Sequence, residues 1–239
     1  MTAGSLSGGG RAPRYRRRRP IPALVMLVLL GLGATIVWLK VIDNHTKDAT
    51  ASVHCDPPTP ATAEPGQPAP PPAPPLGQHV DQNGLDQTLA ATPDQIQIRV
   101  LNASKQRGEA ALVTENLKQL GFSQVGKPDD DPVYPQGSMT CRSQIRFGAQ
   151  GAPAARTMSL LEPCAELIKD GRQDATVDFV IGKKFDDLQV RTETQQVLKQ
   201  IVDWSAQHPP QTGGLQSVQG SAGQQIDQAL VDSIRKTAC

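Results

Sequence analysis

The sequence predicts an α+β protein, a small β-α-β-β-α-β-β sandwich with additional C-terminal helices and one N-terminal transmembrane helix. Three observations predict this class. Stretches of alternating polar and apolar residues indicate half-buried strands, stretches with apolar residues at helical spacing lie between them, and one long uncharged run stands near the N-terminus. This order of elements predicts a sandwich with both helices on one face of a small sheet.

The uncharged run predicts a transmembrane helix at residues 21–41, because roughly 20 apolar residues cross a bilayer as a helix. Six arginines lie between Arg11 and Arg19, so the positive-inside rule places residues 1–20 in the cytoplasm as a basic tail. A cleaved signal peptide is the alternative, but its apolar region is shorter and ends in small residues. We therefore expect a single-pass protein of the cell membrane with its C-terminal domain outside the cell. The positive charge stops at the apolar run, which excludes a basic nucleic-acid-binding surface.

Residues 42–93 have the composition of an extracytoplasmic tether. Between Pro57 and Pro75 the sequence is almost entirely Pro, Ala, Thr, Gly and Gln, which cannot form a core and favours an extended chain. A proline-rich ligand for a recognition domain is the alternative to a spacer. The aromatic share of only 3% also indicates a folded part of modest size.

The folded domain is expected at residues 94–188. Alternating or short apolar stretches predict its strands at residues 95–100, 122–125, 143–147, 165–168 and 176–181. Helical spacing predicts a helix at residues 108–120, which Gly121 ends, and a second helix from Ala152 to Pro163. Residues 189–239 form a helical extension with two predicted helices, 193–204 and 224–236. These helices either pack on the domain or mask a groove in it.

Four cysteines follow the apolar run, and an even number in an oxidising compartment suggests structural disulfides: Cys55, Cys141, Cys164 and Cys239. Their spacing matches no zinc motif. The strand that starts at Cys141 advances about 20 Å, and the following helix returns about 15 Å. We therefore expect Cys141 to pair with Cys164, and Cys55 with Cys239 by elimination, although four cysteines allow three pairings.

The loop before the first helix of the domain is the candidate ligand site. Backbone N–H groups and the helix dipole favour an anion there, and two basic side chains add charge. The candidate residues are Asn102, Ser104, Lys105, Arg107 and Gly108. An ordinary strand-to-helix turn is the alternative. We predict no catalytic residues, no metal site and no cofactor, because no nucleophile, base or ligand set clusters in the sequence.

Several short motifs carry a family resemblance. Val100-Leu101-Asn102-Ala103-Ser104, with Gly108 and Leu120-Gly121-Phe122 after it, resembles the opening of the LytR C-terminal domain family, LytR_C. Ile145-Arg146-Phe147 fits the middle of that family, and Val180-Ile181-Gly182-Lys183 its closing strand. The resemblance covers residues 94–188. The basic tail, apolar run, tether and four cysteines make the whole chain similar to actinobacterial envelope proteins.

The resemblance implies a non-catalytic, extracytoplasmic protein that helps to maintain cell envelope integrity. Its implied partners, besides the membrane, are peptidoglycan or another wall polymer, or the proteins that assemble the wall. In many relatives the domain follows a catalytic LytR-CpsA-Psr domain, but nothing between residues 42 and 94 could fold into one. An enzyme of wall glycopolymer transfer or hydrolysis and the outer part of an envelope-stress sensor are the alternatives.

Overall fold

The computed structural model describes residues 25–38, 54–59, 73–188, 190–209 and 223–236. The chain divides into two units, residues 1–46 and 47–239. In the first unit, residues 25–38 are helical and expose large apolar side chains. Among the described residues, no helix combines the length and the apolar character needed to cross a membrane. Residues 21–24 and 39–41 of the expected span lie outside the described ranges.

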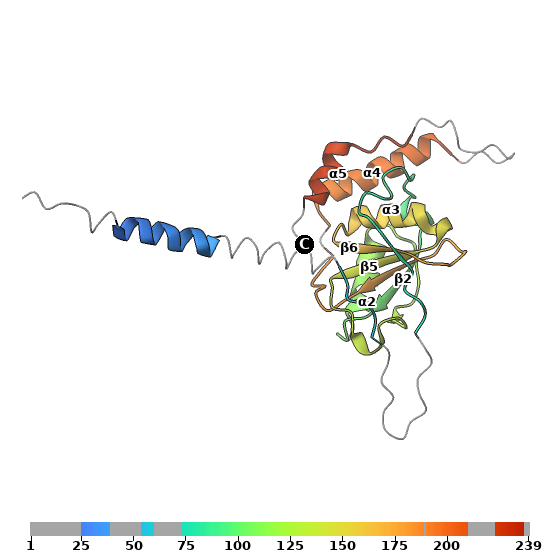
Figure 1. Ribbon diagram of the computed structural model, residues 1–239. Coiled ribbons are helices and arrows are strands. Elements are labelled where there is room, and N and C mark those ends of the chain that lie inside the picture. The colour runs from blue at the N-terminus through green and yellow to red at the C-terminus, as the bar shows by residue number, and fades with distance from the viewer. Residues whose placement is uncertain (1–24, 39–53, 60–72, 189, 210–222, 237–239) are drawn as a thin grey trace, which may run out of the picture. The chain divides into compact units, whose positions relative to one another are not determined.

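The second unit is built on a mixed sheet of seven strands in the order β1-β6-β5-β7-β2-β3, with β4 also paired to β2 (Figure 1). The neighbours β5 and β6 are parallel, as are β2 and β7, whereas β5 and β7 are antiparallel. The strands are β1 (Gln78–Val80), β2 (Gln97–Asn102), β3 (Gln124–Val125), β4 (Asp129–Asp130), β5 (Ser143–Phe147), β6 (Ala165–Lys169) and β7 (Val177–Ile181). The predicted strands of the domain are thus present, and β4 is an additional short strand within an expected loop.

Two helices, α2 (Glu109–Gln119) and α3 (Ala152–Leu161), pack on the same face of the sheet. Leu117 of α2 and Met158 of α3 belong to one apolar cluster with Ile145 and Phe179 of the central strands. The prediction that both helices cover one face is therefore confirmed. Below, this side of the sheet is called the helix face.

The opposite side of the sheet, here called the polar face, is covered by irregular chain. Tyr134 and Met139, from the loop between β4 and β5, form a second apolar cluster with Val180 of β7. Cys55 and Leu76 pack against this cluster. Every residue of β5 and β7 is consequently buried, including the polar ones that point away from the helices.

The sheet starts earlier in the chain than the predicted beginning at residue 94. β1 pairs antiparallel with β6, so that His79 lies opposite Ile168 and Val80 opposite Leu167. Part of the segment 42–93, expected to be a tether, therefore forms the edge strand. A strand of three residues is too short for alternation to reveal it.

The disulfide pairing predicted for Cys141 is wrong, because Cys141 is bonded to Cys55, with the two Cα atoms 4.7 Å apart. The strands β5 and β6 are parallel and start together, with Ser143 opposite Ala165, so Cys141 and Cys164 do stand at the same end of neighbouring strands. Cys141 is nevertheless bonded to Cys55, because the chain around Cys55 packs on the polar face beside Cys141. Cys164 is also disulfide-bonded, and the predicted partner of Cys55, Cys239, lies outside the described residues.

The helices α4 (Thr192–Gln207) and α5 (Gln228–Arg235) lie over α3, on the side away from the strands (Figure 1). Val197 and Ile201 of α4, Val231 of α5 and Leu160 of α3 form a third apolar cluster. Both predicted C-terminal helices are confirmed. They pack on the domain through α3 rather than on the polar face of the sheet.

Candidate functional site

The predicted ligand loop is a turn closed by its own side chains. The side-chain oxygen of Asn102 accepts a hydrogen bond from the Ser104 backbone N–H at 3.0 Å. The Ser104 hydroxyl lies 2.5 Å from a carboxylate oxygen of Glu109, which stands in the first turn of α2. A carboxylate of the chain itself therefore lies close to the start of α2, the end of the helix that favours negative charge. Lys105 and Arg107 are exposed, and an anion site at this loop stays a prediction.

The loop geometry depends on two left-handed backbone positions. Lys105 has φ of 73°, and Gly108, which precedes α2, has φ of 83°. Glycine adopts this conformation without steric cost, so Gly108 suits the position before α2. The structure brings Asn102 and Ser104 together with Glu109, a residue that the sequence analysis did not include.

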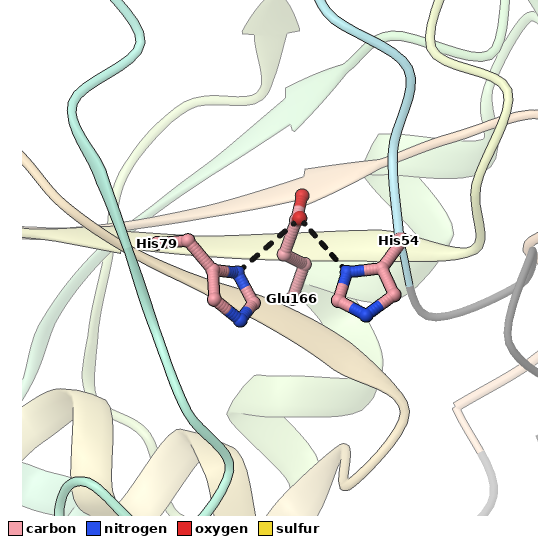
Figure 2. Close-up of side chains that lie close together, drawn as sticks. All are labelled: His54, His79 and Glu166. Atoms are coloured by element: carbon pink, nitrogen blue, oxygen red, sulfur yellow. Dashed lines mark ion pairs between the residues drawn. The ribbon is translucent and has the colours of Figure 1, made fainter.

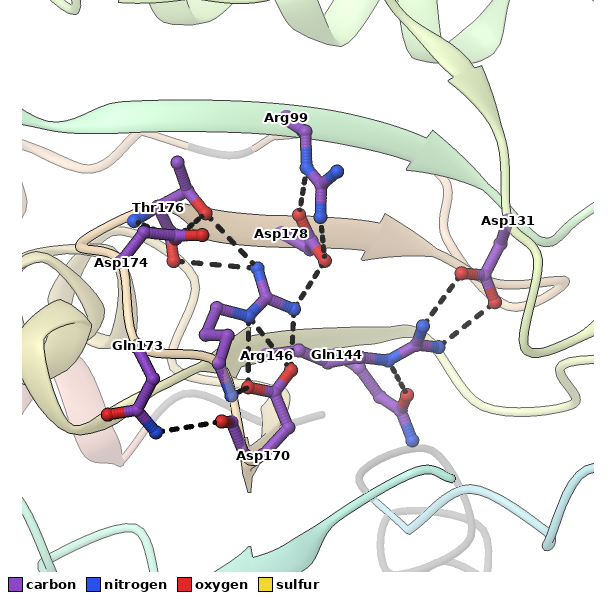
Figure 3. Close-up of polar contacts among 11 residues, drawn as sticks. Arg99, Asp131, Gln144, Arg146, Asp170, Gln173, Asp174, Thr176 and Asp178 are labelled. Carbon is purple, nitrogen blue, oxygen red and sulfur yellow. Dashed lines mark hydrogen bonds and ion pairs between the residues drawn. The ribbon is translucent and has the colours of Figure 1, made fainter. Parts of the chain in front are cut away.

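The polar face carries a network of ion pairs instead (Figure 3). Its most buried member joins Arg146 of β5 to Asp131, through N–O distances of 2.7 and 3.0 Å. Both side chains are almost fully buried, exposed by 3% and 0%. Arg146 also donates to Gln144 at 3.0 Å, and its guanidinium lies 5.5 Å from the centre of the Tyr134 ring. Each polar group here has a partner, as buried charges require.

A second group of ion pairs lies at the end of the sheet where β2 and β7 begin. The carboxylate of Asp178 accepts hydrogen bonds from Arg99 at 2.6 and 2.9 Å and from Arg172 at 2.6 Å. Arg172 also pairs with Asp170. Burial alone would raise the pKa of Asp178, but the hydrogen bonds from Arg172 and Arg99 outweigh it and hold that pKa below its usual value. Asp178 is therefore ionised at neutral pH and fixes both guanidinium groups in place.

A cleft of about 460 Å³ opens beside this second group, within the usual range for small-ligand sites. It is lined by Pro75, Arg99, Asp170, Gly171, Arg172, Asp174 and Thr176. The lining presents two guanidinium groups and two carboxylates, so neither sign of charge dominates. Such a surface offers hydrogen-bond donors and acceptors in fixed positions, which suits a ligand with many hydroxyl groups better than a simple anion.

A third polar group lies near the other edge of the sheet (Figure 2). Glu166 of β6 has a side chain exposed by only 8%, and one of its oxygens accepts a hydrogen bond from Gln144 at 2.7 Å. Its other oxygen, Oε1, faces His79 Nδ1 at 3.4 Å and His54 Nδ1 at 3.6 Å. The sequence analysis assigned both histidines to the tether and predicted no metal site. No local signal could have found this group, because its members come from three segments far apart in the chain.

Residues 95–185 match the model of the LytR_C family, described as LytR cell envelope-related transcriptional attenuator. The chain is also 32% identical, over 187 residues, to the cell envelope integrity protein Cei of Mycobacterium tuberculosis, with 78% of this chain and 82% of Cei covered. The chain belongs to the Cei family. This confirms the resemblance seen in the sequence motifs.

The similarity to Cei extends beyond the LytR_C domain, because it spans more residues than the matched segment 95–185. A solved structure shows the same fold. It is the crystal structure of the soluble domain of a conserved hypothetical secreted protein from Mycobacterium marinum, which is 34% identical. The TM-score is 0.55, and the match covers 69% of this chain and 99% of the other.

Proposed function

We propose that this chain is a non-catalytic, extracytoplasmic member of the Cei family, which helps to maintain cell envelope integrity by binding a wall glycan in the cleft of the polar face. The observation that carries the proposal is the 32% identity to Cei across 82% of that protein. A scaffold for wall-assembly proteins is the alternative use of the same domain. The two differ in whether the isolated chain binds wall material.

The proposed location outside the membrane has two supports. The Cys55–Cys141 disulfide fits an oxidising compartment. The uncharged run of residues 21–39 follows the arginines, an order typical of an anchor with a cytoplasmic N-terminus. We therefore propose that residues 21–41 anchor the chain in the membrane and that the folded unit lies outside.

The chemistry of the cleft supports a glycan ligand. Arg99 and Arg172 are both held by Asp178 before any ligand arrives, so little side-chain freedom is lost when the ligand binds. Sugar hydroxyls both donate and accept hydrogen bonds, and the cleft presents guanidinium donors beside the carboxylate acceptors of Asp170 and Asp174. Because the positive and negative charges of the cleft balance, binding does not require the wall polymer to be anionic.

A co-sedimentation experiment tests this proposal. We expect the purified full-length chain to pellet with insoluble peptidoglycan, and the double variant Arg99→Gln/Asp174→Asn to lose about tenfold or more in affinity. Each replaced group is charged, and charge-assisted hydrogen bonds to the ligand are stronger than those between neutral groups. The variant Lys105→Ala tests the predicted ligand loop at the opposite end of β2, and binding in the cleft predicts that it pellets like the unaltered chain.

Two outcomes would contradict the proposal in different ways. If the unaltered chain does not pellet with any wall fraction, binding of wall polymer is wrong and the scaffold alternative gains support. If Lys105→Ala abolishes binding while the double variant retains it, the ligand binds at the loop after β2 instead of in the cleft.

A further inference from the structure

The group formed by His54, His79 and Glu166 has the ligand types of a transition-metal site. Each residue offers one ligand atom, two imidazole nitrogens and one carboxylate oxygen, and the three atoms lie within 4.8 Å of one another. Figure 2 shows both rings turned so that Nδ1 faces the same carboxylate oxygen. Imidazole nitrogens suit zinc and other transition metals, whereas calcium and magnesium prefer oxygen ligands.

The separations fit coordination better than direct hydrogen bonding. The two distances from the nitrogens to the Glu166 oxygen, 3.4 and 3.6 Å, are long for a hydrogen bond between a ring N–H and a carboxylate. Two ligand atoms that each lie about 2.1 Å from a tetrahedral zinc ion are about 3.4 Å apart. The three ligand atoms lie within 4.8 Å of one another, so rotations of the side chains would bring them around a zinc ion.

The surrounding structure fixes each ligand. His54 precedes Cys55, whose disulfide to Cys141 attaches this segment to the sheet. Next in the chain, the backbone oxygen of Asp56 accepts a hydrogen bond from the Tyr134 hydroxyl at 2.8 Å. The disulfide and this hydrogen bond together leave His54 little freedom to move away from β6.

The other two ligands are held by the sheet itself. β1 pairs with β6, so that His79 lies opposite Ile168, two residues from Glu166. Gln144 donates to the second oxygen of Glu166 at 2.7 Å and leaves the first oxygen facing the histidines. Hydrogen bonds of this kind orient the ligands in known metal sites.

We propose that His54, His79 and Glu166 bind a zinc ion that ties the segment around Cys55 and the edge strand β1 to β6. The His54 and His79 side chains are exposed by 58% and 41%, so the ion can enter from solvent. Three protein ligands leave the fourth tetrahedral position to water or to a group of a bound ligand. This inference does not depend on the proposed glycan-binding function.

Zinc titration of the full-length chain, purified without an affinity tag and treated with a chelator, tests this site by isothermal titration calorimetry. We expect one zinc ion per chain and no measurable binding of Mg²⁺. The variants His54→Asn and His79→Asn should each weaken zinc binding by about tenfold or more, because each removes one of three ligands. The matched control is His208→Asn, since His208 follows α4 and its ring stacks on Trp204.

The test includes a check that the variants fold. Far-UV circular dichroism should be the same for the two ligand variants as for the His208→Asn control, because both histidines are exposed and lie outside the three apolar clusters. The variant Cys55→Ser/Cys141→Ser should also bind zinc more weakly, since it releases the segment that carries His54. An unaltered chain that binds no zinc, or equal affinity in the ligand variants and the control, would overturn the proposal.

Discussion

The two faces of the sheet are built from the same strands but are stabilised in different ways. On the helix face, alternate strand residues such as Ile145 and Phe179 pack with α2 and α3 in one apolar cluster. On the polar face, the intervening residues include Arg146 and Asp178, which are buried and paired with opposite charges. Burial of apolar area stabilises the fold, whereas a buried ion pair gains little over apolar packing because its charges must leave water.

The difference supports the proposal that ligands bind the polar face. The helix face holds the largest apolar cluster, and the C-terminal helices α4 and α5 add a further layer to that side. The charged residues of the polar face are costly to bury, yet they shape both the cleft beside Arg99 and the surroundings of Glu166. Sites that depart from the most stable choice of residue are commonly functional.

The largest expected effect on stability comes from breaking the buried ion pair of the polar face. Arg146→Ala leaves Asp131 with an unpaired charge in the interior, so the free energy of unfolding should fall by about 3–5 kcal/mol. Urea denaturation measures this loss. The paired control Arg146→Met/Asp131→Leu removes both charges and should cost much less. A loss below about 1 kcal/mol for Arg146→Ala would mean that Asp131 is not confined as described.

On the helix face, truncation of one core side chain should lower the free energy of unfolding through lost packing alone. Leu117→Ala removes a fully buried side chain of α2 and should lower the free energy of unfolding by about 2–4 kcal/mol. No charge is removed here, so the loss comes from the packing of apolar side chains alone. Leu112→Ala is the control, since Leu112 of the same helix is 62% exposed. Equal losses for the two leucines would contradict the described packing of α2.

The disulfide should contribute next. Cys55→Ser/Cys141→Ser opens a bond between residues 86 positions apart and should cost about 2–4 kcal/mol, mainly by freeing the unfolded chain. The difference in the free energy of unfolding between the variant and the unaltered chain should disappear when both are measured under reducing conditions. A non-reducing digest checks the pairing itself. We expect the peptide with Cys55 to be joined to that with Cys141, and the peptide with Cys164 to the C-terminal one.

The smallest expected effect is a dependence of the stability of the fold on pH, through the carboxylate of Asp178. Because Arg172 and Arg99 hold the pKa of Asp178 below its usual value, the ionised carboxylate stabilises the fold above about pH 4. This contribution is lost as the pH falls through the lowered pKa. Asp178→Asn should therefore show a shallower loss of stability between neutral and acid pH. Asp129→Asn, at an exposed position, is the control; an equal slope in both variants would contradict the assignment.

Most of the helix face could be predicted from the sequence. The alternation in residues 143–147 and the helical spacing that includes Leu117 both reflect contact with one apolar surface, and each is visible locally. Gly121, with φ of 93°, ends α2 as expected. The polar side of these strands differs from the prediction, because it is buried too. Alternation predicts strands with only one buried face, but Arg146 and Asp178 on the other face are buried as well, because irregular chain covers them.

The polar face could not be predicted because its contacts join segments that have no local pattern. His54 and His79 stand near proline-rich chain, and only the pairing of β1 with β6 and the bond of Cys55 to Cys141 bring them to Glu166. The predicted disulfide failed for the same reason. Distances along the chain between Cys141 and Cys164 carry no information about the distant segment around Cys55, which packs on the polar face.

The central claim is that ligands bind the polar face and not the helix side of the domain. Nuclear magnetic resonance of the isotope-labelled full-length chain, titrated with soluble peptidoglycan fragments, tests it most directly. We predict that backbone signals around Arg99 and Arg172 shift in a saturable manner, while those of α4 and α5 do not move. Shifts confined to α4 and α5, or to the loop around Lys105, would contradict the claim.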